Sequence, residues 1–198
     1  MTTRRQFIEG TIAAGFSVAA VAPSIVKAFE RDAGSGSHLR LNRVVFDERV
    51  ANARVFAEEA RKRFVKTSAI NGSLHELWYN DLYYHWRDEK SPTAGITDAR
   101  SLFLLEMMAT DAGMRVVHRV HHCESDGTYV HRVFGPLQRR DELAARMSGM
   151  QTNWARHAAD IVMSWPSSPT SIAPQRSNIL SARLQALDAR TLVSWIIR

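Results

Sequence analysis

Hydrophobic and polar positions between residues 43 and 117 follow two alternating periods. Val44-Val45-Phe46 is a continuous apolar run, which is typical of a buried strand. From Arg49 to Phe64, apolar residues recur at helical spacing with charged residues between them, which predicts an amphipathic helix. The same succession of strand and helix repeats along the chain.

The repeats define the expected fold class. Strands are predicted over residues 65–70, 93–97 and 114–117, with helices from Ser73 and from Asp98 between them. Short strands separated by helices favour βαβ crossovers. We therefore predict an α/β fold, a three-layer sandwich whose mostly parallel sheet has the order βαβαβαβ, followed by a β-hairpin and C-terminal helices.

The second half of the chain departs from this alternation. Asp126-Gly127 favours a tight hairpin turn, followed by an antiparallel strand over residues 129–134. A long helix is predicted over residues 138–163, because an apolar stripe recurs there at helical spacing. The stripe comprises Leu143, Met147, Met150, Trp154 and Ile161. A proline- and serine-rich loop over residues 165–174, a short helix over 180–187 and a last strand over 191–197 complete the prediction.

The first 28 residues have the order of an export signal. A short positive head with Arg4 and Arg5 precedes an apolar stretch over residues 10–26 and a small-residue exit at Ala28. The stretch has 17 residues and contains Pro23, whereas a membrane-spanning helix needs about 20 strongly apolar residues. We therefore predict cleavage after Ala28 and no lasting membrane span.

The head resembles the twin-arginine (Tat) signal peptides of bacteria. Their pattern is a polar residue, two arginines, a variable residue and a bulky apolar pair, often followed by lysine. Thr3-Arg4-Arg5-Gln6-Phe7-Ile8 fits this pattern, although Glu9 stands where lysine is common. The resemblance covers residues 1–28 only. It implies recognition by the Tat translocon, export in a folded state and a location in the periplasm or outside the cell. An ordinary secretory signal with two arginines is the alternative.

Composition limits the class of the remaining chain. Residues 29–42 contain Gly34-Ser35-Gly36-Ser37 and are predicted to be a flexible linker, and residues 43–198 to be a single domain. The formal net charge of +6 comes from basic residues scattered among acidic ones, so no nucleic-acid partner is predicted. The sequence has no nucleotide, haem or iron–sulfur motif, and we predict none of these cofactors.

The hairpin carries the densest group of metal-ligating side chains. With Asp126 and Gly127 in the turn, His122 lies opposite His131. Two imidazoles on opposed residues can share one divalent metal ion, with a third ligand from the same face. The candidate ligands are His118, His122, Glu124 and His131. The alternative is a solvated hairpin whose histidines and arginines keep an exposed ribbon from aggregating.

Cys123 is the only cysteine, so no intramolecular disulfide is possible. It adjoins His122, but neighbours along a strand point to opposite faces of the sheet. A small, half-buried free cysteine is therefore favoured over a catalytic nucleophile.

A second candidate site follows from the predicted sheet itself. Ligands of open α/β sheets bind beyond the carboxyl ends of the parallel strands. Backbone amides where Gly72 and Ser73 open a helix could hold a phosphate or a carboxylate. The candidate residues are Asp47, Arg49, Asn71, Gly72, Ser73, Thr97 and Asp98. Asn-Gly-Ser is also an ordinary way for a strand to turn into a helix.

An aromatic run over residues 77–86 is the third feature. On a helix, Tyr79, Tyr83 and Trp86 form a stripe about 100° from the apolar stripe that faces the sheet. Aromatic side chains are enriched at protein interfaces and in ligand pockets. The stripe is therefore either part of the core or a partner surface.

Three functions fit these features. The preferred one is an exported binding or accessory protein, a small subunit or partner of a larger periplasmic enzyme of the redox kind, rather than an enzyme itself. The first alternative is a metal-binding protein or metal-dependent hydrolase that uses the hairpin histidines. The second is a protein that binds a small anion at the strand ends.

Overall fold

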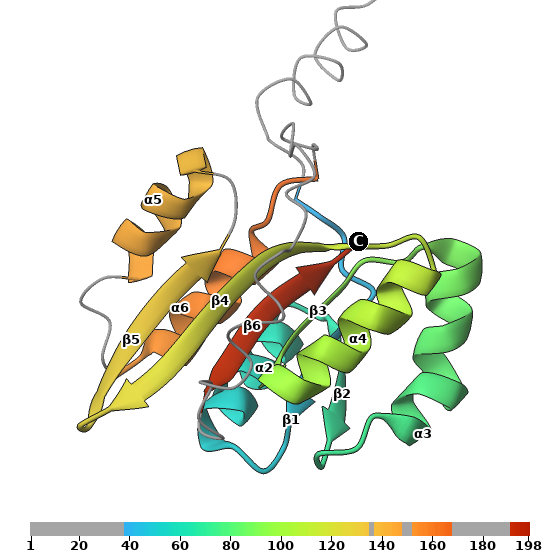
Figure 1. The fold of residues 1–198 in the computed structure, drawn as a ribbon, viewed down its shortest axis with the longest axis horizontal. Coiled ribbons are helices and arrows are strands. Elements are labelled where there is room, and N and C mark those ends of the chain that lie inside the picture. The colour runs from blue at the N-terminus through green and yellow to red at the C-terminus, as the bar shows by residue number, and fades with distance from the viewer. Residues whose placement is uncertain (1–37, 135–136, 148–151, 168–190) are drawn as a thin grey trace, which may run out of the picture. The chain divides into compact units, whose positions relative to one another are not determined.

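Six strands form one mixed sheet in the computed structural model, which describes residues 38–134, 137–147, 152–167 and 191–198 (Figure 1). The strands lie side by side in the order β2-β1-β3-β6-β4-β5. Their bounds are β1 (Arg43–Asp47), β2 (Lys66–Ile70), β3 (Thr93–Asp98), β4 (Val116–Ser125), β5 (Thr128–Phe134) and β6 (Leu192–Ile197). The central strands β1 and β6 are buried along their whole length, and the edge strands are partly exposed.

The α/β class is confirmed, but the strand directions do not confirm the predicted mostly parallel sheet. β1 pairs in parallel with β2 and with β3, whereas the β3–β6, β6–β4 and β4–β5 pairings are antiparallel. The cause is β6, which was predicted as the last strand. It lies between β3 and β4 and pairs antiparallel with both. These two parallel strands therefore do not pair directly with each other.

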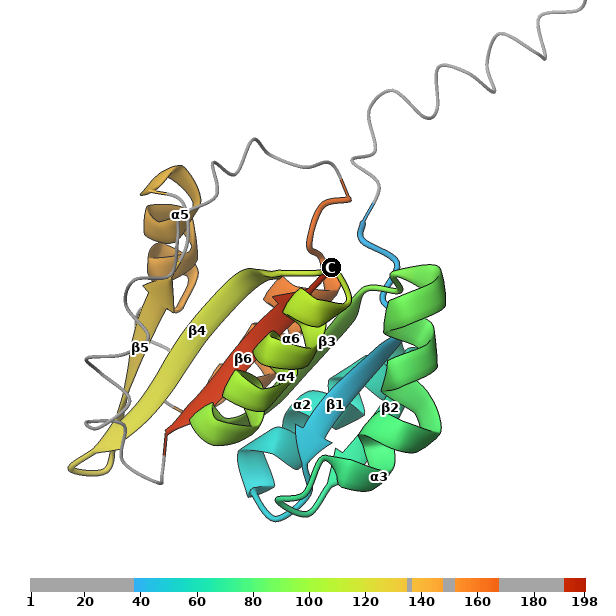
Figure 2. The same ribbon diagram turned by 45° about the vertical axis from the view of Figure 1, so that its right-hand side comes forward.

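Helices pack against both faces of the sheet. One face carries α2 (Ala51–Lys62), α5 (Leu137–Met147) and α6 (Trp154–Met163), and the other carries α3 (His75–Leu77), the π-helical segments η1 (Trp78–Leu82) and η2 (His85–Glu89), and α4 (Ala99–Asp111). Strand alternation divides the core accordingly, because Val44 and Phe46 face the first group of helices while Val45 faces the second. In Figure 2, α4 crosses the near face of the sheet and α2 and α6 lie behind it.

The predicted long helix over residues 138–163 is wrong. Two helices, α5 and α6, replace it, and Thr152 and Asn153 are not helical. Threonine and asparagine are weak helix formers, so a break at this point is not opposed by local propensity. The stripe itself is a buried one: Leu143, Met147, Trp154 and Ile161 are all in the core, and Met150 lies outside the described residues.

The N-terminal boundary of the domain lies earlier than predicted. Leu39 and Leu41 pack against the core, and the backbone N–H of Leu39 donates to the carbonyl oxygen of Trp165. Residues 38–42 are therefore part of the fold and not of a linker. The predicted signal over residues 1–28, the Gly-Ser segment and the short helix over 180–187 lie outside the described residues. Within the described part of the chain, no helix is long and apolar enough to cross a bilayer.

Candidate pocket at the carboxyl edge of the sheet

A cavity of about 500 Å³ opens where β1, β3 and β4 end. The pocket draws on both candidate sites that the sequence indicated separately. Its lining comprises Asp47, Arg49, Val50, Asn52, Asp98, His122, Glu124, Tyr129 and Leu192. The strand ends supply Asp47, Arg49 and Asp98, and the hairpin supplies His122 and Glu124. A volume of this size is within the range of small-molecule sites.

Arg49 is fixed on the wall of the pocket by the buried carboxylate of Asp47. Its Nε donates to Asp47 Oδ1 at 2.9 Å and its Nη2 to Asp47 Oδ2 at 2.6 Å, while its backbone N–H donates to the same Oδ1 at 3.0 Å. The Asp47 side chain is 1% exposed and the Arg49 side chain 54% exposed. Burial acts to raise the pKa of Asp47, but the hydrogen bonds and charge of Arg49 outweigh it and lower that pKa. The guanidinium of Arg49 therefore stays charged, and the buried Asp47 carboxylate fixes its orientation.

Gly72 makes room for this guanidinium. A Cβ on Gly72 would come within 3.0 Å of the Arg49 side chain, closer than real Cβ atoms approach, and the φ of Gly72 is +93°. The left-handed backbone favours glycine here. Gly72 does not line the pocket, and its role as a backbone anion site stays a prediction.

Asp98 lies beside Arg49 and begins helix α4. Its Oδ1 accepts from the backbone N–H of Ser101 at 2.6 Å, a regular N-cap, and its Oδ2 lies 3.8 Å from Arg49 Nη2. The cap fixes the Asp98 carboxylate at the pocket, so the guanidinium of Arg49 lies between two carboxylates.

The hairpin forms the opposite wall. Glu124 and Tyr129 are register partners, as predicted, and the Tyr129 hydroxyl donates to Glu124 Oε2 at 3.3 Å. Asn52 Nδ2 of α2 donates to the same hydroxyl oxygen at 3.1 Å. Burial and the neighbouring Glu124 raise the pKa of Tyr129, so the phenol stays protonated and able to donate.

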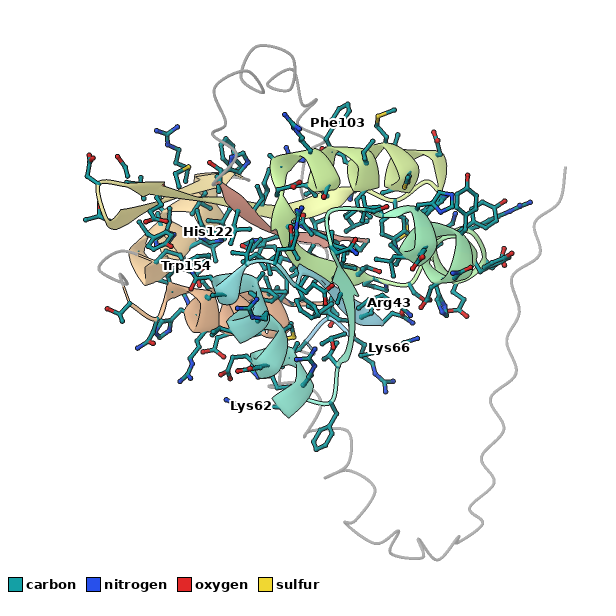
Figure 3. All side chains as sticks on the ribbon, turned by 90° about the horizontal axis from the view of Figure 1, so that it is seen from below. Arg43, Lys62, Lys66, Phe103, His122 and Trp154 are labelled. Atoms are coloured by element: carbon teal, nitrogen blue, oxygen red, sulfur yellow. The ribbon has the colours of Figure 1, made fainter. Side chains whose placement is uncertain are left out.

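His122 lies at the inner end of this wall, stacked on Trp154 of α6 with ring centroids 4.2 Å apart (Figure 3). Its Nδ1 is 2.8 Å from His131 Nδ1, and its Nε2 is 3.0 Å from Ser194 Oγ. Burial, then the nearby His131, lowers its pKa well below the ordinary value of 6.5. His122 is therefore a neutral imidazole that joins β4, β5 and β6.

The predicted metal ligands are only partly brought together. The register of the hairpin is confirmed, and it sets His122 against His131 and Glu124 against Tyr129. His118 is on the same face but four residues away along β4, about 13 Å by the rise of a strand, and its ring packs on Trp165. It cannot share an ion with His122. Among the described residues, no group of three or more His, Cys, Asp or Glu side chains could hold a metal ion.

Only some of the predicted strand-end residues line the pocket. Thr97 is buried and does not line the pocket, and its hydroxyl oxygen accepts from Trp195 Nε1 at 3.1 Å. Asn71 and Ser73 are exposed and do not line the pocket. The Ser73 hydroxyl is 3.4 Å from the backbone N–H of His75, a local contact at the start of α3.

Trp86 belongs to the core and not to the predicted aromatic partner surface. This side chain is fully buried, and its Nε1 donates to Thr93 Oγ1 at 2.9 Å. Tyr79 is 60% exposed, and Tyr83 is half-buried. The reason is the π-helical geometry, with i→i+5 hydrogen bonds from Tyr83 to Trp78 and from Lys90 to His85. Residues seven apart share a face of an α-helix, but wider turns rotate Trp86 away from Tyr79 and into the core.

Cys123 is half-buried, and Sγ accepts from Thr191 Oγ1 at 3.7 Å. It faces away from His122, as expected of neighbours on a strand. The free, half-buried cysteine predicted from the sequence is confirmed.

Four residues of the pocket were not among the predicted sites: Val50, Asn52, Tyr129 and Leu192. Tyr129 was recognisable as the partner of Glu124, whereas Leu192 enters only because β6 is inserted beside β4.

Comparisons of the chain with protein-family models, with curated proteins and with solved structures found no match.

Proposed function

We propose that this chain is an exported binding protein that holds a small polar molecule in the pocket at the carboxyl edge of its sheet. The export part of the proposal is supported by the order of residues 1–28, with the paired Arg4 and Arg5. The binding part is supported by the cavity and by the charged and hydrogen-bonding groups on its walls.

One observation carries the proposal. A buried carboxylate, that of Asp47, is used to hold the half-exposed guanidinium of Arg49 at the mouth of a cavity. A guanidinium held by a fixed partner loses little freedom when it binds a ligand, which favours recognition.

A fragment screen of the full chain by two-dimensional NMR tests the proposal. We expect polar fragments to shift the amide signals of Asn52, Glu124 and Tyr129 from three different wall segments of the pocket. Arg49→Lys should weaken this binding about tenfold, because a lysine keeps the charge but not the bidentate contact with Asp47.

Arg54→Lys is the matched control. Arg54 lies on the same helix end, where its Nη1 donates to the Glu48 carbonyl oxygen, but it does not line the pocket. Fragment binding should be unchanged in this variant. Absence of pocket shifts across a polar fragment set, or equal losses in both variants, would contradict the proposal.

A second candidate function is the predicted docking to a larger periplasmic enzyme. The specific observation in its favour is the pair Tyr79, in η1, and Tyr84, between η1 and η2, which are 60% and 58% exposed. We expect co-purification of the native protein with a partner chain, and loss of the partner in a Tyr79→Ser/Tyr84→Ser variant. A Phe64→Ser variant, which removes another exposed aromatic residue elsewhere, is the control. Recovery of the protein alone from the periplasm would count against docking.

The divalent-metal alternative has one geometric support, the 2.8 Å between the Nδ1 atoms of His122 and His131. Both atoms can ligate one ion only if neither carries a proton. Elemental analysis of protein purified without a polyhistidine tag decides this point. Stoichiometric metal that is lost in a His122→Ala/His131→Ala variant would support a metal site, and metal-free protein would leave the contact as a hydrogen bond.

A further inference from the structure

Helix α2 ends in a turn in which glycine is the usual residue. The backbone N–H of Phe64 donates to the carbonyl oxygen of Arg61 at 2.9 Å, and that of Val65 donates to Ala60 at 3.1 Å. These two hydrogen bonds form a Schellman motif, whose left-handed position is commonly glycine. Here that position is Phe64, with φ +60°. A side chain with a Cβ is unfavourable in this conformation, so Phe64 has a strained backbone.

The side chain of Phe64 projects from the fold. It is 98% exposed, so the ring makes almost no contact with the rest of the protein and adds no packing energy to it. An apolar ring that is fully hydrated gains free energy when another apolar phase covers it. Phe64 therefore offers an apolar group to a partner outside the fold.

Basic side chains surround Phe64 along the chain. α2 ends with Arg61 and Lys62, Arg63 follows, and Lys66 begins β2. All four are exposed, and Figure 3 shows Lys62 and Lys66 on the side of the molecule where α2 ends. We call residues 61–66 the basic turn.

Two cations of the basic turn have a carboxylate partner near the surface. Lys62 Nζ lies 2.8 Å from Glu59 Oε1, and Arg63 pairs with Asp160 of α6. Arg156 of α6 also lies 3.5 Å from Glu59, so two cations share that carboxylate. Ion pairs at the surface are weak, so these cations can exchange their partners for other anions.

The other two cations are less neutralised. Arg61 contacts neutral groups, because its Nε donates to Thr67 Oγ1 at 3.0 Å and its guanidinium lies over the ring of Phe46. Lys66 Nζ is 3.4 Å from Asp81, a carboxylate that already pairs with the buried Arg43.

Positive charge is therefore in excess at this end of α2. Among the described residues 58–66 and their partners on α6, five exposed cations stand against three carboxylates. These are Arg61, Lys62, Arg63, Lys66 and Arg156 against Glu58, Glu59 and Asp160.

A bilayer with anionic lipids has the chemistry that matches the basic turn. Lipid phosphates attract lysine and arginine, and the boundary between headgroups and acyl chains takes up aromatic side chains. Because Phe64 is 98% exposed, no groove surrounds the ring. A protein partner would have to supply a pocket for it, and single-stranded nucleic acids are usually held by several stacking side chains in a groove. A bilayer accepts a single projecting ring directly.

We propose that the basic turn is a membrane-contact site. Phe64 enters the headgroup boundary of a bilayer that contains anionic lipids, and the basic side chains around it bind lipid phosphates. The chain then lies reversibly on the bilayer surface. The inference goes beyond ligand binding, since no residue of the basic turn lines the pocket.

Co-sedimentation of the full chain with vesicles tests the inference. One set of vesicles is phosphatidylcholine alone, and the other contains equal parts of phosphatidylcholine and phosphatidylglycerol. We expect about tenfold tighter binding to the anionic vesicles, and this preference should shrink as the salt concentration rises. Every variant carries the same residues 1–28, so differences between variants report on the basic turn.

Phe64→Gly separates a role in binding from a role in folding. Glycine adopts a positive φ without strain, so the variant should keep or raise the Tm. Its binding to anionic vesicles should weaken about tenfold, because the ring is lost. Phe64→Trp should retain the binding, since tryptophan enters the same boundary. Met107→Ser is the control, because Met107 is 54% exposed on α4, which packs on the other face of the sheet.

Lys62→Gln/Lys66→Gln tests the cations. This variant should bind anionic vesicles about tenfold more weakly and should show a smaller salt dependence than wild type. Arg87→Gln/Arg100→Gln has the same net charge and removes two exposed cations of η2 and α4. Its binding should stay close to that of wild type.

Three results would overturn the membrane contact. They are equal binding to neutral and anionic vesicles, equal binding of wild type and Phe64→Gly, and equal losses in Phe64→Gly and Met107→Ser. A titration with a fluorescent oligothymidylate tests the other class of anionic partner. Oligonucleotide binding that is lost in Phe64→Gly, with no binding to vesicles, would assign the basic turn to nucleic acid instead.

Discussion

Replacement of Asp47 by asparagine is the most direct test of how the pocket is built. Asparagine has nearly the shape of aspartate, so the change removes a charge without opening a cavity. It retains one acceptor oxygen for Arg49, but its second terminal atom becomes an NH₂ group that faces the N–H groups of the guanidinium. At least one of the three hydrogen bonds between Arg49 and Asp47 is then lost.

The expected cost follows from burial. A hydrogen bond to a charged group contributes about 1.5–3 kcal/mol. The cost stays near the lower part of this range because Arg49 is half-exposed and can regain water, so no unpaired charge is left in the core. We expect the Asp47→Asn variant to lose about 2 kcal/mol of the free energy of unfolding at pH 7.

The pH dependence gives the experiment its specificity. The pKa of Asp47 in the folded chain is lowered from the ordinary value of 3.8. The ionised group therefore contributes its full stability above about pH 4, and the contribution is lost as the pH falls through the folded-state pKa. Urea unfolding from pH 7 down to pH 3, followed by tryptophan fluorescence, should show the difference between wild type and variant shrinking at the acid end.

Glu48→Gln is the matched control for this series. Glu48 is the neighbouring, exposed carboxylate, and its replacement should change the free energy of unfolding by less than about 0.5 kcal/mol. An Asp47→Asn cost that is equally small at pH 7, or one of the same size at pH 3, would refute the view that an ion pair holds Arg49.

Two other predictions concern the sheet that carries the pocket. Gly95→Ala should destabilise the fold by about 2 kcal/mol or more in urea unfolding, because a Cβ would come within 3.0 Å of both the Trp195 ring and the Val45 carbonyl oxygen. The cost should fall in a Trp195→Leu background, and an unchanged cost there would show that the ring is not the obstacle. Burial, and then the charges of Arg119 and Arg132, lower the pKa of His121 from 6.5 to about 4. As the pH drops from 6.5 to 4, His121 is protonated in the unfolded chain before it is protonated in the folded chain. The free energy of unfolding therefore falls over this pH range. His121→Gln should remove up to roughly 3 kcal/mol of that fall, whereas the exposed His75→Gln should leave it unchanged.

The parts of the fold that could be predicted are those set by neighbours in the chain. Asp126-Gly127 fixes a tight turn, and the turn alone determines that His122 lies opposite His131 and Glu124 opposite Tyr129. The burial of Trp86 could not be predicted in the same way. The assumption of regular α-helical turns failed in η1 and η2, where the hydrogen bonds span five residues instead of four.

The end of β1 and the hairpin line the same pocket because of the position of β6, which no local sequence pattern reveals. Two antiparallel pairings, β3 with β6 and β6 with β4, reverse the strand direction twice. β4 therefore runs in the same direction as β1 and β3, and its carboxyl end lies at the same edge of the sheet. This is why Glu124 of the hairpin and Arg49, which follows β1, line one cavity. Had β6 been at the outer edge, β4 would have lain one strand spacing, about 5 Å, closer to β1. The insertion of β6 thus sets the distance between the two strands whose ends line the pocket.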